Sequence, residues 1–217
     1  MSMFSWLFPE KCVLCGRVLE REELDLCKQC RIDAPECPAS KTKYPFLDEW
    51  TALWYYEKDV RRSLLRYKFY GKRNLASAYA RLLGMKLLTE DRADFDILTW
   101  IPISKKRLRK RGFDQVQLLA EKLGSELGVT PVSTLRKVRH NKQQSRIVGF
   151  AQRRANVLGA YEVADPAAVM GKRILLLDDI LTTGATAGEC ARVLLTAGAK
   201  EVKFAAIAAA RQHKTGR

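Results

Sequence analysis

Two neighbouring carboxylates stand directly after a short apolar segment of the chain. Residues 174–177 are four consecutive apolar residues, and Asp178 and Asp179 follow them. Such a run predicts a strand buried on both faces, so the acids would follow its carboxyl end. Open α/β sheets bind their ligands at this end of their strands. A stretch of mostly hydroxyl residues comes next, namely Thr182, Thr183, Gly184, Ala185 and Thr186.

The stretch from Thr182 to Thr186 has the composition of a phosphate-binding loop. Its hydroxyls, its backbone N–H groups and the positive end of the helix expected from about Ala185 would face an anion. The two acids need another partner, because bare carboxylates repel phosphate; they would accept hydrogen bonds from sugar hydroxyls or hold Mg²⁺. A simple helix cap after a buried strand is the alternative, but it explains one threonine and not two acids beside it.

A second cluster of polar groups follows another predicted strand, at residues 97–103. Six of the seven residues from Lys105 to Arg111 are basic. We expect a loop of cations with exposed N–H groups at this strand end, which would suit the several charges of a pyrophosphate. A solvated basic face is the alternative interpretation. The predicted pyrophosphate-binding residues are Ser104, Lys105, Lys106 and Arg107.

The region from Leu127 to Tyr161 contains seven lysines or arginines and no acidic residue. Its polar centre predicts a flexible loop. Such a loop could close over a bound substrate and add positive charge at a leaving group. A nucleic-acid-binding arm would use the same residues, so both uses stay open. The residues assigned to the loop are Arg139, Lys142 and Arg146.

Four of the six cysteines form two C-x-x-C pairs near the N-terminus. Each pair forms a turn that directs two thiolates at one point, and two pairs supply the tetrahedral sulfur shell of a structural Zn²⁺ site. A redox dithiol would need only one pair, and buried free thiols would not need this spacing. The predicted zinc ligands are Cys12, Cys15, Cys27 and Cys30.

The remaining pattern predicts an α/β fold around these sites. Strands are expected at residues 51–56, 97–103, 174–177 and 201–208, and helices at residues 60–67, 74–88, 114–127 and 185–198. Asn74 and Asp114 stand where helix caps are expected. Strand, helix and strand in the C-terminal part imply a parallel sheet. We therefore expect a zinc module in residues 1–38 and a ligand-binding domain in residues 46–217.

The composition favours polyanionic partners. The 217 residues carry a formal net charge of +15, which suits polyphosphates or nucleic acid, although a solubilising surface would have the same balance. Residues 66–73 interleave basic and aromatic side chains, as a surface that stacks nucleobases would; a helix end with inward-facing aromatics is the alternative. Apolar runs are too short to span a bilayer, so we expect no membrane insertion and a cytoplasmic protein.

The string from the apolar run through Asp-Asp to Thr-Thr-Gly-Ala-Thr resembles the 5-phosphoribosyl-1-pyrophosphate (PRPP) motif of type I phosphoribosyltransferases. With the cysteine pairs, Ile-Pro-Ile before Arg-Gly-Phe-Asp-Gln, and the stretch from Arg153 to Tyr161, the chain is similar to ComF-type competence proteins over essentially its whole length. Asp114 stands where that family usually has asparagine, and either residue caps a helix. The resemblance implies a type I phosphoribosyltransferase-like parallel sheet flanked by helices, with a small N-terminal zinc-binding module.

The resemblance also implies PRPP with Mg²⁺ as the ligand and a part in DNA uptake during natural transformation. In one hypothesis the chain is an enzyme: an unknown acceptor displaces pyrophosphate from PRPP, with Asp178 and Asp179 as catalytic residues and residues 182–186 around the 5-phosphate. In the other, it senses PRPP without catalysis, binds single-stranded DNA and partners the uptake machinery, for example a DNA-uptake helicase. The sequence leaves both hypotheses open.

Overall fold

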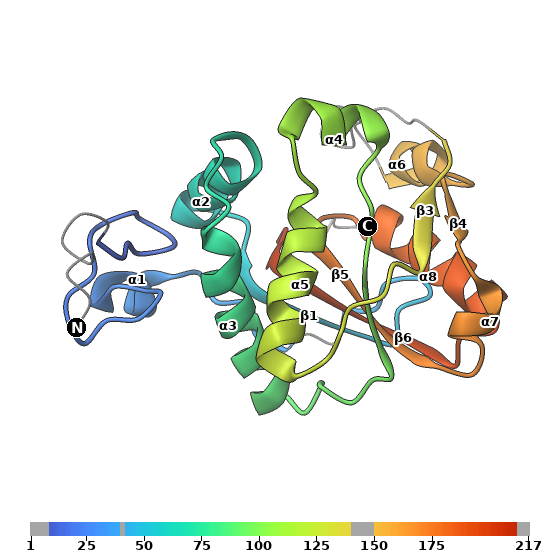
Figure 1. Cartoon of the computed structure of the whole chain (residues 1–217), viewed down its shortest axis with the longest axis horizontal. Helices are drawn as coiled ribbons and strands as arrows, with labels where there is room; N and C mark the ends of the chain where they lie inside the picture. Colours follow the sequence, from blue (N-terminus) through green and yellow to red (C-terminus); the bar gives the residue numbers. More distant parts are fainter. Residues whose placement is uncertain (1–8, 40–41, 140–149, 212–217) are drawn as a thin grey trace, which may run out of the picture.

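Figure 1 shows the chain as a computed structural model, which describes residues 9–39, 42–139 and 150–211. Four strands form one sheet in the order β1, β6, β5, β2, and every neighbouring pair in it is parallel. The bounds of these strands are β1 Glu49–Tyr55, β2 Ile97–Trp100, β5 Arg173–Leu181 and β6 Glu201–Ala209. A separate antiparallel pair consists of β3 Leu135–Lys137 and β4 Tyr161–Val163. The predicted parallel sheet is confirmed.

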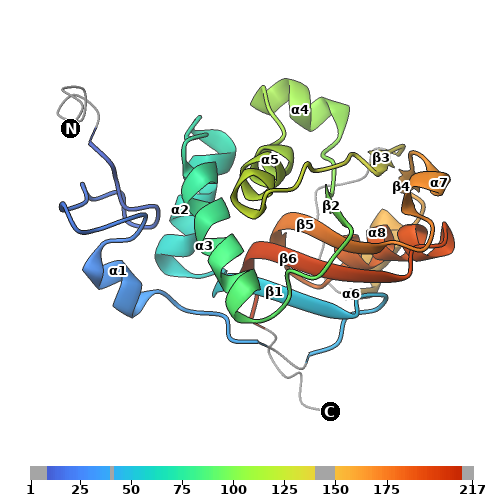
Figure 2. The same ribbon diagram turned by 60° about the horizontal axis from the view of Figure 1, so that its bottom comes forward.

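Helices cover both faces of the sheet. Their bounds are α1 Lys28–Asp33, α2 Lys58–Phe69, α3 Leu75–Thr89, α4 Lys105–Arg111, α5 Gln115–Leu127, α6 Phe150–Val157, α7 Pro166–Val169 and α8 Ala185–Thr196. Because side chains alternate along a strand, Leu175 and Leu177 of β5 pack in one buried cluster with α2, α3 and α5, whereas Ile174 and Leu176 pack in another with α8. Figure 2 shows the same layering from a second direction.

Short sequence signals set the helix starts. Asp114 precedes α5, and its carboxylate accepts hydrogen bonds from the N–H groups of Val116 and Gln117, as a capping residue does. Asn74 precedes α3 where a cap was expected, but its side chain makes no capping hydrogen bond. Its backbone is already helical (φ −59°, ψ −22°) rather than extended, so the expected capping role of Asn74 is wrong.

Two strand ends differ from expectation. β5 continues to Leu181, and its ladder with β6 includes the pair Asp178 and Ala206. The acidic pair therefore lies within the strand and not in a loop after it. β2 ends at Trp100 instead of residue 103, since Pro102 has no N–H group to continue a ladder.

The N-terminal segment packs against the helical layer formed by α2 and α3. Val13 and Leu14 are buried in the same hydrophobic cluster as residues of both helices. Arg81 of α3 also donates a hydrogen bond of 3.0 Å to the carboxylate of Asp25. In Figure 1 this segment and α1 lie at the opposite end of the molecule from α8. Among the described helices, none combines the length and the apolar character needed to cross a bilayer.

Candidate functional site

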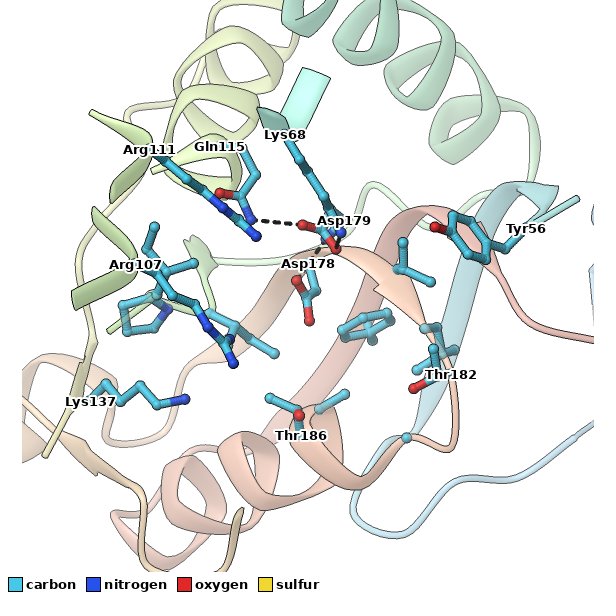
Figure 3. A pocket seen from close by; sticks show the side chains of 18 of the residues that line it. Tyr56, Lys68, Arg107, Arg111, Gln115, Lys137, Asp178, Asp179, Thr182 and Thr186 are labelled. Carbon is cyan, nitrogen blue, oxygen red and sulfur yellow. Dashed lines mark hydrogen bonds and ion pairs between the residues drawn. The ribbon is translucent and has the colours of Figure 1, made fainter. Parts of the chain in front are cut away.

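The two carboxylates at the end of β5 face different elements. Asp179 lies on the side of α2 and α5, where its Oδ1 is 2.7 Å from Nζ of Lys68 and its Oδ2 accepts a 2.8 Å hydrogen bond from Nε2 of Gln115. Asp178 points away from this pair of helices in Figure 3. Its Oδ1 accepts the backbone N–H of Asp179 at 2.7 Å. The strand geometry thus gives one acid a cation and the other only a backbone donor.

This difference in surroundings gives the two acids different electrostatics. Asp179 is 7% exposed, and its charge is balanced by Lys68, whose side chain is 14% exposed. Burial, followed by the neighbouring Asp179 carboxylate, raises the pKa of Asp178 well above its usual range. A ligand that donates hydrogen bonds to Asp178 would favour its ionised form.

The predicted phosphate-binding loop joins β5 to α8. Gly184 is the residue before α8 and has a left-handed backbone (φ 74°). A Cβ atom there would overlap the ring of Tyr44, so both conformation and space require glycine. Thr182, Gly184 and Thr186 line the cavity described below, whereas the Thr183 hydroxyl accepts the N–H of Ala185 at 3.5 Å.

The predicted pyrophosphate loop is a helix, α4, and not a loop. The hydroxyl of Ser104 accepts the N–H of Arg107 at 3.4 Å, which begins the helix, and Gly112 ends it in a left-handed conformation. The expectation of an irregular loop is wrong, because Ser104 caps the N-terminus of a helix and Gly112 caps its C-terminus. Arg107 lines the cavity, Ser104 is buried, and Lys105 and Lys106 are exposed.

A cavity of about 510 Å³ lies at the carboxyl ends of the strands. Its volume falls in the usual range for small-molecule sites, about 300 to 1,000 Å³. Asp178 and Asp179 share its wall with five basic side chains, so the cavity carries an excess of positive charge. The basic residues that line it are Arg61, Lys68, Arg107, Arg111 and Lys137.

The predicted flexible-loop residues are only partly described. Arg139 donates a hydrogen bond of 2.6 Å to the carbonyl oxygen of Leu158 and is not among the lining residues of the cavity. Lys142 and Arg146 lie outside the described residues.

Five lining residues with basic or amide side chains were missed as site residues from the sequence: Arg61, Lys68, Arg111, Gln115 and Lys137. Lys68 stood in the segment interpreted as a basic and aromatic surface, Arg111 in the basic run after Ser104, and Lys137 in the region interpreted as a loop. Gln115 directly follows the capping residue Asp114. Its place in the first turn of a helix could have indicated a site residue, because the first turn of a helix after a strand end faces the ligand side of the sheet. Its Oε1 is the buried side-chain atom without a hydrogen-bond partner in the described part of the chain.

The four predicted zinc ligands come together. The sulfur atoms of Cys12, Cys15, Cys27 and Cys30 all lie within 4.8 Å of one another. Zn–S bonds of about 2.3 Å in a tetrahedron require S···S separations of about 3.8 Å, and the Sγ atoms of Cys15 and Cys27 are 3.8 Å apart. The sulfur cluster therefore fits a structural Zn²⁺ ion.

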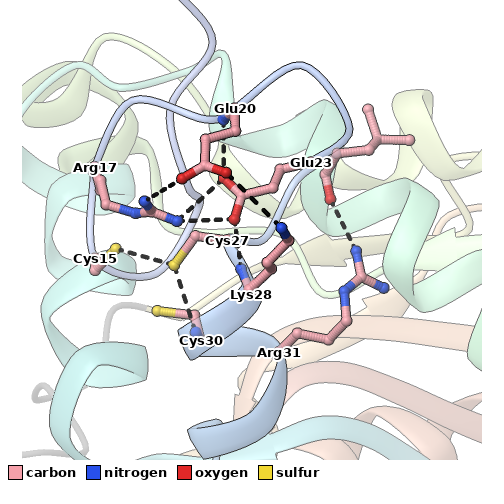
Figure 4. Close-up of polar contacts among 9 residues, drawn as sticks. Cys15, Arg17, Glu20, Glu23, Cys27, Lys28, Cys30 and Arg31 are labelled. Atoms are coloured by element: carbon pink, nitrogen blue, oxygen red, sulfur yellow. Dashed lines mark hydrogen bonds and ion pairs between the residues drawn. The ribbon is translucent and has the colours of Figure 1, made fainter.

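Charged side chains surround the sulfur cluster (Figure 4). Burial opposes ionisation of Cys27, but hydrogen bonds, first from the Cys30 backbone N–H, lower its pKa to about 7. Glu23 accepts hydrogen bonds from the backbone N–H groups of Glu20 (2.9 Å) and Lys28 (2.7 Å) and pairs with Arg17. These contacts fix the loop between the two cysteine pairs.

Helix α2 contacts both the cysteine segment and the cavity. The guanidinium of Arg66 donates to the carbonyl oxygens of Val13 (3.0 Å) and Leu14 (2.5 Å), between the first two cysteines. Two residues later, Lys68 pairs with Asp179. Two sites that are far apart in sequence are thus bridged by one helix of twelve residues.

Comparison with known proteins agrees with this geometry. Residues 109–217 match the phosphoribosyl transferase domain family. DNA utilization protein YhgH of Salmonella typhi is 30% identical, with 88% of this chain and 87% of that protein covered. Competence protein ComFC of Streptococcus pneumoniae is 29% identical, with 89% and 97% covered. Competence protein F of Haemophilus influenzae is 24% identical, with 94% and 98% covered.

The parallel sheet, the cavity at its carboxyl edge and the four-cysteine segment define a phosphoribosyltransferase-type protein with an added segment whose cysteines could hold a metal ion. The chain belongs to the phosphoribosyltransferase family and, within it, to the ComF-type competence proteins.

Proposed function

We propose that the cavity binds PRPP and that the chain acts in DNA uptake. The observation that carries the proposal is the convergence of the acidic pair, the residue 182–186 loop and a set of basic side chains on one cavity. A ligand with a sugar between two phosphorylated ends matches this order of acceptors and cations. The part in DNA uptake rests on the names of the competence and DNA utilization relatives. In this proposal residues 1–38 hold zinc and residues 46–217 hold PRPP.

The proposed reaction is displacement of pyrophosphate from C1 of the ribose by an acceptor nucleophile, here unidentified. The new bond forms at C1 as the bond from C1 to the pyrophosphate oxygen breaks, and positive charge develops on the ring. Asp178 and Asp179 would accept hydrogen bonds from the ribose hydroxyls. Their negative charge would stabilise the transition state, in which the ring is positively charged. The loop from Thr182 to Thr186 would hold the 5-phosphate, and Arg107 would contact the pyrophosphate. Positioning and electrostatics supply most of such a rate increase.

Mg²⁺ is the proposed companion ion of the ligand. The hard oxygen donors of a diphosphate and of the neighbouring Asp178 suit this cation. When bound, it would neutralise negative charge on the pyrophosphate leaving group.

Calorimetric titration of Mg²⁺ and PRPP into the full chain tests the proposal. We expect binding that weakens about tenfold in Asp178→Asn and in Asp179→Asn, since each loses a charge-assisted hydrogen bond. Asp33→Asn changes an exposed carboxylate of α1 and serves as the control with unchanged affinity. The absence of any PRPP binding at millimolar concentration would refute the proposal.

Enzyme and sensor are then separated by pyrophosphate release. A panel of nucleobases and simple amines is offered as acceptors to the PRPP-bound chain. Release that depends on one acceptor and is lost in Asp179→Asn identifies an enzyme, whereas binding without release across the panel identifies a PRPP-sensing protein.

A second candidate function is binding of single-stranded nucleic acid beside the cavity. Phe69 and Tyr70 at the end of α2 are 51% and 72% exposed. Arg111 of α4 stacks on Phe69 at 4.9 Å from its ring centroid. Exposed aromatic rings beside cations are the groups that stack bases and contact phosphates in such sites.

The test of this second function uses a fluorescent oligothymidylate. We expect Tyr70→Ala to weaken binding about fivefold or more, because stacking contributes about 1 to 3 kcal/mol per base. Ile32→Ala removes another exposed apolar side chain, on α1, and is expected to bind like the unaltered chain. Equal affinity of both variants would contradict an aromatic platform at the end of α2.

A further inference from the structure

Lys137 reaches the ligand cavity from outside the main sheet. It lies at the end of β3, where its register partner on β4 is Tyr161. Its amino group donates a 2.8 Å hydrogen bond to the hydroxyl of Tyr161 and lies 4.5 Å from the centroid of that ring. Figure 3 shows the side chain directed toward the cavity, on the same side as Arg107. The tyrosine therefore fixes the position of a cavity-lining cation.

The residue before Lys137 in β3 points in the opposite direction. Arg136 faces solvent on the other side of β3 and pairs with Glu162 at 3.0 Å, because successive side chains in a strand point to opposite faces. Lys137 and Arg136 are thus adjacent cations of which one lines the cavity and the other is already neutralised.

Lys137 has no carboxylate within 4.0 Å in the described part of the chain. Burial first, and then the nearby Arg107 guanidinium, lowers the pKa of Lys137 to about 8; Cys190 and Asp178, which also face it, act in the opposite direction. Arg107 likewise lacks an ion-pair partner among the described residues. Two close cations without an ion-pair partner repel each other, and an anion between them would remove that repulsion.

We infer that Lys137 and Arg107 together form the subsite for the diphosphate end of the ligand, with Tyr161 as the residue that positions Lys137. The inference rests on the proposed function for the identity of the ligand. Two cations from two elements match a diphosphate, which carries more charge than a single phosphate ester. Thr182 and Thr186 of the residue 182–186 loop lie to the right of this pair in Figure 3, so that loop is left for the monophosphate end.

The experiment compares inorganic pyrophosphate with ribose 5-phosphate, each titrated with Mg²⁺ into the full chain. We expect Lys137→Met to weaken pyrophosphate binding about tenfold or more and to change ribose 5-phosphate binding less than twofold, since the lost contact is a charge-assisted one at the diphosphate end. Lys137→Arg should restore most of the pyrophosphate affinity. Arg136→Met removes the same charge one residue away and should leave both affinities within twofold of the unaltered chain.

A second readout follows the proton on Lys137. Because anion binding raises the pKa of a lysine, pyrophosphate binding near pH 8 should take up a proton, seen as a binding enthalpy that depends on the ionisation enthalpy of the buffer. This dependence should shrink in Lys137→Met. Tyr161→Phe removes the hydrogen bond from Lys137 and keeps the ring, so it should weaken pyrophosphate binding less than Lys137→Met does.

The outcomes separate this inference from the proposed function. Pyrophosphate binding that is unchanged in Lys137→Met, or equal losses for both ligands, would overturn the inference, as would no pyrophosphate binding by the unaltered chain. Pyrophosphate binding that needs Lys137, combined with no binding of ribose 5-phosphate or PRPP, would support the subsite and refute PRPP as the ligand.

Discussion

At the scale of single residues, the two adjacent acids of β5 make different contributions. Asp179 is held by Lys68 and Gln115, so its ionised form is compensated within the protein. Asp178 has no ion pair with any described residue, and its raised pKa means that the folded state disfavours its charge. Asp178 therefore lowers the stability of the fold while it lines the ligand cavity, which is the trade-off between stability and function common at binding sites.

Asp178→Asn should therefore stabilise the protein. With a folded-state pKa above the unfolded value, the unfolded chain loses this proton at lower pH, so the stability of the native protein falls as pH rises between the two pKa values. The variant removes that penalty, and we expect a gain of about 1 to 2 kcal/mol near pH 7.5, or roughly 4 °C in Tm. Thermal unfolding at pH 5 should give a smaller gain. A lower Tm at both pH values would contradict the assigned environment of Asp178.

Residue types alone predicted part of this site. Asp178, Asp179 and three members of the residue 182–186 loop line the cavity, because a motif contiguous in sequence stays contiguous at a strand end. Lys68 and Lys137 were not predicted as site residues, since each arrives from an element whose orientation depends on long-range packing. A lone lysine in a basic segment looks the same in sequence whether it faces solvent or a cavity.

At the scale of elements, the turn from β5 into α8 depends on Gly184. Its left-handed backbone disfavours any other residue, and its contact with Tyr44 leaves no room for a side chain. The residues before Gly184 are tied to β6 by the sheet ladder. The loop is therefore held at both ends, which preorganises its N–H groups and hydroxyls.

Gly184→Ala should destabilise the fold more than Gly71→Ala. Both glycines have positive φ, 74° and 66°, so both substitutions strain the backbone, by about 1 kcal/mol. Nothing lies within 4 Å of a Cβ at Gly71, whereas one at Gly184 overlaps Tyr44, so we expect a total of about 3 kcal/mol there. Urea unfolding of the two variants measures the difference. Equal losses would show that Tyr44 moves away freely.

Removal of zinc should loosen α2 before it affects the sheet. The carbonyl oxygens of Val13 and Leu14, which Arg66 contacts, are held in place by the turn between Cys12 and Cys15. After chelation we expect faster amide hydrogen exchange in residues 58–69 and little change in β5 and β6. Metal analysis should first give about one zinc per chain. Unchanged exchange in α2 after full zinc loss would contradict this coupling.

Element boundaries were predicted best where a single residue decides them. Asp114 set the start of α5 through its capping hydrogen bonds, whereas the extent of β5 was underestimated. The two acids continue the strand because β6 pairs with their backbone, and backbone pairing does not depend on side-chain polarity. The basic run after Ser104 became a helix because Ser104 caps its start and Gly112 caps its end, and none of its side chains has to be fully buried.

At the scale of the whole molecule, part of the net charge of +15 lies at the cavity, which five basic side chains line. The basic helix α4 contributes Arg107 and Arg111 to the cavity, leaves Lys105 and Lys106 exposed, and places Arg111 on the Phe69 ring at the end of α2. One short helix thus faces both the proposed PRPP site and the proposed nucleic-acid surface.

Nucleic-acid binding should weaken steeply with salt. If about four phosphates are contacted, the logarithm of the association constant should fall with the logarithm of salt concentration with a slope near −3, because single strands release about 0.7 counterion per contact. Anisotropy of a labelled oligothymidylate between 50 and 300 mM salt measures this, and substitution of the exposed lysine two residues after Tyr70, Lys72→Met, should reduce the slope. An affinity that does not respond to salt would exclude a phosphate-contacting surface.

The fold class was predictable from the sequence because three independent patterns agreed: buried apolar runs, polar residues at two strand ends and two cysteine pairs. The relation between the cysteine segment and the cavity was not predictable. It depends on Arg66 and Lys68 projecting from opposite sides of α2, and the contacts of both are made with residues more than fifty positions away in sequence.

That arrangement of α2 would make metal retention and ligand occupancy mutually dependent. If loss of zinc displaces the helix and weakens the Lys68 contact with Asp179, thermodynamic reciprocity requires that a ligand which favours the intact contact also slows the departure of zinc. A chain filled with its ligand would then survive metal scarcity longer than an empty one.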